Sequence, residues 1–361
     1  MFNPFKRLPA DPSKRFYKGF LRLSDKRVFK IYSQKAGDPD VPGISGFDSV
    51  VRLNSTYLEL VDRNYRWRGG WSLAGAFFFC LFLVGGAQSL ISQFGAGFHS
   101  AVVWVVAIII WGITLLLSWG TYRMMTSEVF FSTYYPIRLN RKNGMVYVYQ
   151  SGGTVLSAPW RDIRFTLSSG KVFCSTEWTI FGCLIAEDGN SITQGFPLPV
   201  NLNLGAESLG MFWEFIRCYM EEGDEYLPDL ADTISWCPPV EKQKEGWFFG
   251  LLYLYKQYVW QGLIFNLPLF PLVLLISITR WLVMLTCKIP EWPAEVAAAC
   301  RPDENDPISK GAEHNPPQVW RPMLGLQGKE RYARTFAKER GAMDRVVARL
   351  KAKYGGQNHA D

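Results

Sequence analysis

The sequence contains one long stretch, residues 69–122, without any Lys, Arg, Asp or Glu. Within it, residues 71–91 and 101–118 are almost wholly apolar, and a polar turn at residues 92–100 separates them. Crossing the hydrocarbon core of a bilayer, which is about 30 Å thick, takes about 20 helical residues. Residues 71–120 are therefore predicted to form a transmembrane helical hairpin. The alternative is a buried hairpin of a large soluble core, in which helices rarely run this long without a charge.

Basic residues flank both ends of this hairpin and are absent from its turn. They are Arg63, Arg66 and Arg68 before the first apolar segment, and Arg123, Arg138, Arg141 and Lys142 after the second. Cytoplasmic flanks of membrane-spanning segments carry an excess of Lys and Arg. We therefore expect a multi-pass membrane protein, with both hairpin ends in the cytoplasm and the turn outside.

A second hydrophobic region covers residues 247–287, and two prolines, Pro268 and Pro271, interrupt it. It fits either a single span preceded by an aromatic interfacial stretch, or a second hairpin or re-entrant segment that bends near the prolines. Residues 301–361 carry 12 Lys and Arg against 8 acidic residues, and a single span would place this basic tail outside. The distribution of positive charge favours the hairpin or re-entrant segment.

Charge divides the 361-residue chain, whose net charge is +7, into distinct modules. Residues 1–70 carry 14 basic and 7 acidic residues and read as a basic arm with strands, whereas residues 123–246 carry 10 and 15. Hydrophobic residues make up 48% of the chain, and the mean hydropathy is near zero. This composition excludes a disordered chain, a small disulfide scaffold and a permease that lies mostly in lipid.

The N-terminal residues and the cysteines bear on the cellular compartment. Residues 1–15 lack the apolar core of a signal peptide. The seven cysteines form no Cys-x-x-Cys pair, which fits free thiols in a reducing cytoplasm. Zinc ligation by Cys174 and Cys183 is a weak alternative, because a structural zinc site needs further ligands and no second pair lies nearby.

Residues 123–246 predict a β-rich cytoplasmic domain. Short strand patterns alternate with turn signals, of which Asn143-Gly144 is the strongest, and residues 207–222 then predict a helix that stops at Gly223. Antiparallel strands followed by one helix indicate an α+β fold, a curved sheet closed by that helix. This order, with the turn Ala158-Pro159-Trp160-x-x-Ile163, resembles the pleckstrin-homology-like domains of bacterial membrane proteins. The resemblance implies that the hairpin is inserted between the N-terminal strands and the rest of the domain.

An acidic segment follows the predicted helix, with six acidic residues among residues 221–232. A solvated loop is one interpretation, and a docking surface for a basic protein is the other. Electrostatic complementarity would speed association and exclude wrong partners, and an exposed aromatic side chain among the acids would serve as an anchor. The candidate partner-binding residues are Glu221, Glu222, Asp224, Glu225, Tyr226, Asp229 and Asp232.

The tail, residues 301–361, predicts a polar linker followed by a basic helix. Residues 329–353 contain nine Lys and Arg and three acids. The apolar residues Tyr332, Phe336, Met343, Val346, Val347 and Leu350 recur at helical spacing. The basic faces could contact anionic lipid, or the apolar stripe could pack on the main domain.

The sequence contains no recognisable catalytic arrangement. The three histidines, His99, His314 and His359, have no companions at ligand spacing, and phosphate-loop, nucleophile-elbow and zinc-protease motifs are absent. We therefore expect no enzymatic activity, no metal or cofactor, and no nucleic-acid partner.

Taken together, these features resemble a family of proteobacterial membrane proteins encoded beside type VI secretion effectors, some of which are cognate immunity proteins. The resemblance rests on the basic arm, the hairpin, the β domain with Trp160 and Trp178, and the aromatic region 247–287. It implies a non-enzymatic inner-membrane protein whose cytoplasmic domain binds and neutralises a secreted toxin. The alternative is a lipid-sensing or scaffold membrane protein that uses its pleckstrin-homology-like domain.

Overall fold

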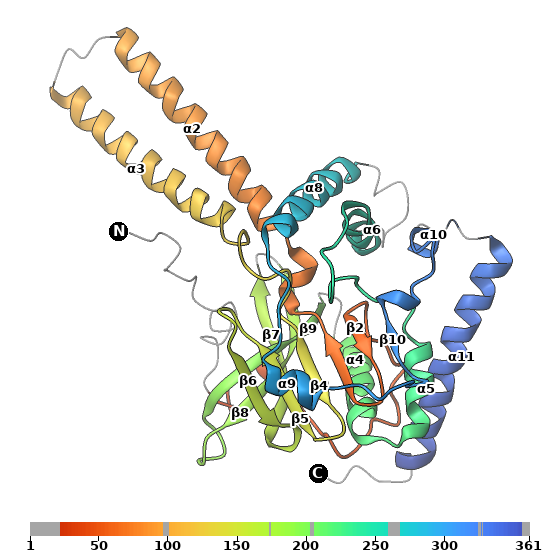
Figure 1. Cartoon of the computed structure of the whole chain (residues 1–361). Coiled ribbons are helices and arrows are strands. Elements are labelled where there is room, and N and C mark those ends of the chain that lie inside the picture. Colours follow the sequence, from red (N-terminus) through yellow and green to blue (C-terminus); the bar gives the residue numbers. More distant parts are fainter. Residues whose placement is uncertain are drawn as a thin grey trace. The chain divides into compact units, whose positions relative to one another are not determined.

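The computed structural model describes residues 22–96, 101–172, 175–202, 206–258, 268–323, 326 and 328–355 (Figure 1). These residues form two compact units, each of which is built from separated parts of the chain. The sheet unit comprises the described residues up to 65, residues 132–244 and those from 289 onward. The helical unit comprises residues 66–131 and 245–288. The fold is mixed α+β, as the sequence predicts.

The larger sheet has six antiparallel strands in the order β10-β2-β3-β4-β5-β6. The strands are β2 (Val50–Leu53), β3 (Tyr57–Leu60), β4 (Ile137–Asn140), β5 (Met145–Tyr149), β6 (Val155–Pro159) and β10 (Lys310–Gly311). Leu58 on β3 lies opposite Leu139 on β4, so residues 66–131 are inserted between two neighbouring strands. This confirms the predicted insertion of the apolar hairpin. The strand β10 falls in the predicted linker, and it pairs with β2 through Lys310 and Leu53.

The second sheet has the order β1-β7-β8-β9 and is followed by one helix. Its elements are β1 (Val28–Tyr32), β7 (Ile163–Val172), β8 (Ser175–Ile185), β9 (Ile192–Leu202) and α4 (Ala206–Glu221). Helix α4 confirms the helix predicted at 207–222, and its apolar face is buried in the core. There the Trp213 ring packs against Trp160, with ring centroids 5.8 Å apart, and against Phe165 at 4.8 Å. Aromatic burial of this kind closes the sheet unit.

Further helices complete the sheet unit. They are α5 (Leu227–Asp232), α9 (Ala294–Ala299), α10 (Trp320–Met323) and α11 (Lys329–Tyr354). The last of these is the basic helix that the sequence predicts.

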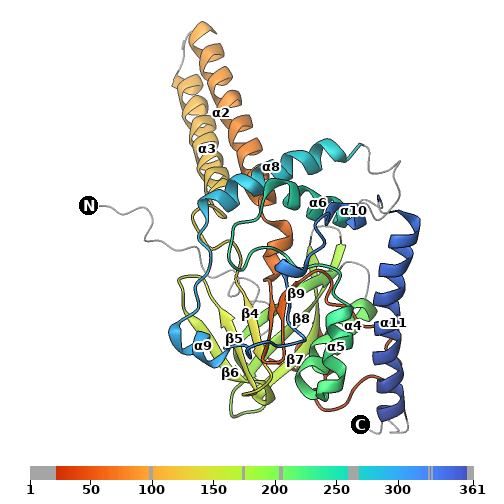
Figure 2. The ribbon, with the colours of Figure 1, turned by 45° about the vertical axis from the view of Figure 1, so that its right-hand side comes forward.

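The helical unit contains α2 (Gly70–Ala96), α3 (Ala101–Met125), α6 (Trp247–Tyr258) and α8 (Phe270–Thr286). Helices α2 and α3 pack against each other, are long and apolar enough to cross a membrane, and are largely exposed. The second hydrophobic region forms two packed helices (Figure 2) rather than one continuous helix. Residues 259–267, which include part of the predicted bend, lie outside the described residues.

Candidate docking site on the acidic segment

The acidic segment, residues 221–232, begins at the end of α4 and folds into a short 3-10 turn and α5. Helix α11 packs along α5, and both views of the ribbon show them side by side (Figures 1 and 2). The acidic segment therefore has a basic partner in its own chain.

Four ion pairs join α11 to the acidic segment. Lys338 lies 2.8 Å from Asp232, and Asp229 receives Arg345 at 2.7 Å and Arg349 at 2.9 Å. Near the end of the helix, Lys353 lies 2.7 Å from Glu222. Residues spaced by three, four or seven positions share one face of a helix, so these cations form a single stripe that faces the carboxylates.

The apolar stripe of α11 is only partly packed. Ala342, Val346, Leu350 and Tyr354 are buried against the sheet unit. In contrast, Tyr332 and Phe336 are each 49% exposed, and their rings stack on each other with centroids 6.0 Å apart. The apolar stripe is thus packed along the second half of α11, whereas the first half contacts the domain through the Lys338–Asp232 ion pair.

A buried charge cluster anchors the end of this interface. Arg217 on α4 is fully buried and donates to Glu214 and Glu222, each over 2.7 Å. Glu222 also accepts hydrogen bonds from Lys353 at 2.7 Å and from the Tyr354 hydroxyl at 2.8 Å. Burial alone would raise the pKa of Glu222, but these donors hold it below its usual value. Burial raises the pKa of Glu214.

Tyr226 does not have the exposure expected of an anchor for a partner. It is 4% exposed, and the Arg349 guanidinium lies 5.3 Å from the centre of its ring. The expectation of an exposed aromatic side chain is therefore wrong for this conformation. The 3-10 turn between α4 and α5 places the Tyr226 ring against α11.

The seven candidate residues fall into two groups. Glu222, Tyr226, Asp229 and Asp232 contact α11. The side chains of Glu221, Asp224 and Glu225 are exposed. Of these, Glu221 accepts a hydrogen bond from the Trp160 indole over 2.5 Å, and Asp224 lies 2.9 Å from Arg141. The exposed group remains accessible to another molecule while α11 is docked.

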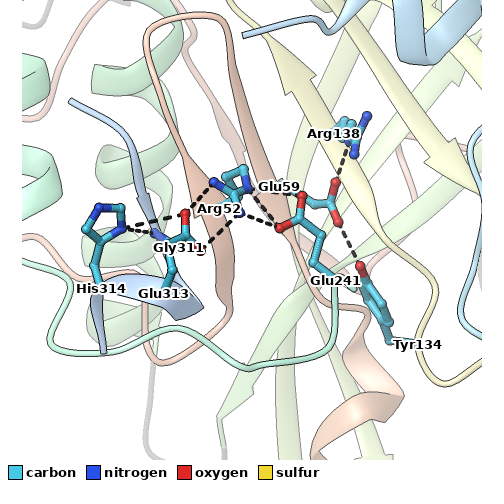
Figure 3. A network of polar contacts seen from close by, with 8 residues as sticks. All are labelled: Arg52, Glu59, Tyr134, Arg138, Glu241, Gly311, Glu313 and His314. Atoms are coloured by element: carbon cyan, nitrogen blue, oxygen red, sulfur yellow. Dashed lines mark hydrogen bonds and ion pairs between the residues drawn. The ribbon is translucent and has the colours of Figure 1, made fainter. Parts of the chain in front are cut away.

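A second polar network lies across the six-stranded sheet and was not predicted from the sequence (Figure 3). Arg52 binds Glu241 at 2.6 Å and Glu313 at 2.8 Å. The fully buried Glu59 pairs with Arg138 and accepts a hydrogen bond from the Tyr134 hydroxyl over 2.8 Å.

Aromatic rings flank one of the cations in this network. Arg138 lies between the rings of Tyr57 and Trp292, at 4.5 Å and 4.7 Å from their centres. His314 lies 3.6 Å from Glu313. Each Arg and Glu side chain drawn in Figure 3 has an opposite charge beside it. Such pairing joins β2, β3 and β4 to distant segments.

The described residues contain no group of three His, Cys, Asp or Glu side chains that could hold a metal ion. Cys183, one of the two cysteines considered for zinc, is a buried free thiol. Its possible companion Cys174, together with His99 and His359, lies outside the described residues.

Residues 107–304 match DUF6708, a family of unknown function. This match covers more than half of the chain. The protein belongs to the DUF6708 family. The part that matches the DUF6708 family contains α4, the acidic segment, α6 and α8, whereas α11 lies outside it. No curated protein and no solved structure matches the chain.

Proposed function

We propose that this protein is a membrane-anchored, non-enzymatic protein that binds a basic partner protein through its acidic segment. By the resemblance of its sequence to immunity proteins, the proposed partner is a cognate secreted toxin, a type VI effector, which binding would neutralise. The observation that carries the proposal is the set of four ion pairs between the acidic segment and α11. The carboxylates are spaced to receive a basic amphipathic helix.

The proposed binding has two stages. The exposed carboxylates Glu221, Asp224 and Glu225 meet the partner first and steer its approach. Glu222, Asp229 and Asp232 then become available if a basic surface of the partner takes the place of α11. Rim contacts mainly set the rate of association, whereas contacts in a desolvated centre set the rate of dissociation.

The topology of the sheet unit supports attachment by a hairpin with both ends in the cytoplasm. Strands β3, β4 and β10 belong to one hydrogen-bonded sheet, yet residues 66–131 and 245–288 lie between them in sequence. A sheet lies on one side of a membrane, so each intervening segment crosses an even number of times. The basic flanks favour the cytoplasmic side.

The strand order also supports the proposed pleckstrin-homology-like architecture. Strands β3 to β6 form a meander, β7 to β9 form a second meander, and α4 follows. We propose that β3 to β9 and α4 form such a domain, whose first two strands are the pair that flanks the inserted hairpin α2–α3.

The test is co-purification of the full-length protein with effectors encoded beside it, followed by a co-expression toxicity assay. Charge reversal of Glu221, Asp224 and Glu225 to Lys should slow association and make it less sensitive to salt. The matched control reverses three exposed acids elsewhere on the sheet unit, Asp162, Glu187 and Glu295. If no protein partner is recovered, and the reversed protein binds anionic liposomes like the wild type, the lipid-scaffold function replaces this proposal.

A further inference from the structure

Helix α8 buries its one charged residue and exposes large apolar side chains. Its packed face carries Ser277 and Arg280, both fully buried, beside the apolar Val273, Val283 and Met284. Its outward face carries large apolar side chains that are 39–52% exposed, namely Leu275, Ile278, Leu282 and Leu285. A surface helix of a water-soluble protein shows the opposite arrangement. A helix in contact with lipid turns its charged residues toward protein and pairs them there.

The buried polar groups of α8 are bound within the helical unit. Arg280 donates to Glu245 over 2.7 Å and 2.8 Å, and its guanidinium lies 5.1 Å from the centre of the Tyr253 ring on α6. The Trp247 indole donates to the Ser277 hydroxyl over 3.1 Å. These contacts fix the rotation of α8, so that its apolar face is directed away from α6.

The end of α8 lies at the base of the hairpin α2–α3. Gly69, just before α2, is so close to Arg280 that an added Cβ would lie 2.5 Å from the Arg280 Cα atom. The Lys288 amide donates to the Phe131 carbonyl over 2.7 Å. The Glu128 carboxylate binds the amides of Gly69 and Ser72 over 3.1 Å and 3.0 Å. These contacts bring together three segments at the base of the hairpin: the start of α2, the chain that follows α3, and the end of α8.

From that base, α8 runs sideways rather than alongside α2 and α3 (Figures 1 and 2). Its 17 residues extend about 25 Å at 1.5 Å per residue, which is short of a bilayer core of about 30 Å. Residues 245–288 must also cross an even number of times, because β10 and β4 share a sheet. A single crossing by α8 fails both conditions.

We infer that α8 is an interfacial helix that lies along the membrane surface, with its Leu and Ile face in the headgroup and acyl boundary of the leaflet that α2 and α3 leave. The inference rests on the membrane attachment in the proposed function. The Arg280–Glu245 pair sets the rotation of α8, and the contacts of Gly69 and Lys288 set its depth. Interfacial helices of this kind bury an apolar face about 5–10 Å deep.

Nitroxide depth measurements on the full-length protein in phosphatidylcholine and phosphatidylglycerol nanodiscs test this inference. Labels are placed at Leu275→Cys or Leu285→Cys after Cys80 and Cys174 are replaced by Ala, because the other five cysteines are buried. Ile109→Cys on α3 is the deep control, and Ala348→Cys on α11 is the aqueous control.

The two α8 labels should be accessible to oxygen at similar, shallow depths, above that of the Ile109 label. Depths that differ by about 15 Å, the length of ten helical residues, would show a crossing helix and overturn the inference. The inference would also be overturned if the α8 labels were as accessible to aqueous nickel as the Ala348 label. A deep Ile109 label in the same experiment would show that the membrane anchor is still correct. Aqueous accessibility at Ile109 would refute the anchor itself.

Discussion

The guanidinium of Arg345 donates to the carboxylate of Asp229 over 2.7 Å, which joins α11 to a segment 116 residues earlier in the chain. Arg349 binds the same carboxylate from the next turn of the helix. Two segments of opposite charge, each of which suggests a surface for another molecule, therefore bind each other. Release of α11 is a property that can be measured in the protein alone.

Replacement of Asp229 by Ala should weaken the docking of α11. The Asp229 carboxylate is 9% exposed and binds both Arg345 and Arg349. Loss of these charge-assisted hydrogen bonds should cost about 1–3 kcal/mol, although water can still reach both guanidinium groups and Arg349 also donates to the Glu225 carbonyl. Hydrogen exchange of the α11 amides and urea unfolding should both report this loss. Asp224→Ala is the control, because Asp224 is 88% exposed and a surface pair contributes about 0–1 kcal/mol. Equal effects of the two changes would contradict the assigned interface.

The two halves of α11 should respond differently to truncation of an apolar side chain. Leu350→Ala removes a fully buried side chain and should lower the free energy of unfolding by about 2–5 kcal/mol. Phe336→Ala removes a larger side chain that is half exposed, and it should change the same quantity by about 0.5 kcal/mol or less. Urea unfolding of both variants decides the point, and a large effect of Phe336→Ala would mean that the first half of α11 is packed as well.

The sequence predicts those parts of the fold that depend on local pattern. An uncharged apolar stretch specifies α2 and α3, and an apolar face followed by Gly223 specifies α4. The strand β10 has only two residues, which is too short to show the alternation of polar and apolar residues that predicts a strand. The Glu59–Arg138 pair depends on the register of β3 against β4, which local pattern does not determine.

The acidic segment shows the same limit at the candidate site. Its six carboxylates have similar neighbours in sequence, yet Glu222 is buried and Glu225 is exposed. The difference arises because Arg217, Lys353 and Tyr354 meet at Glu222, and two of these residues lie more than a hundred positions away. The positive charge of residues 329–353 is the one sequence feature that could have predicted this contact. The prediction would have required comparing that segment with the acidic segment, rather than interpreting each alone.

Replacement of Arg217 by Met should destabilise the protein in a pH-dependent way. It leaves Glu214 and Glu222 buried without their shared cation, at a cost of about 3–5 kcal/mol near pH 7. Burial already raises the pKa of Glu214, and the loss of Arg217 raises it further. When the pKa of a carboxyl is higher in the folded state than in the unfolded state, the folded protein loses stability as the pH rises from the lower pKa through the higher one.

The deficit of Arg217→Met relative to the wild type should therefore be smaller at pH 5 than at pH 8. Urea unfolding at both values measures it. Adding Glu214→Gln to Arg217→Met removes one buried charge, so the double variant should recover part of the loss at pH 8. A deficit that is equal at the two pH values would show that the carboxyls escape to solvent when Arg217 is removed.

Sites in the three parts of the sheet unit should share one side of the membrane. Lys26, Glu187 and Ala348 are exposed residues of this unit, and a hydrogen-bonded sheet holds their three parts together. A cysteine introduced at one of these positions at a time, again with Cys80 and Cys174 replaced, should resist an impermeant reagent in intact cells and react after permeabilisation. Ser92→Cys, near the end of α2, should react in intact cells. Labelling of Ala348→Cys from outside would require the chain to cross once after residue 244, and it would contradict the pairing of β10 with β2.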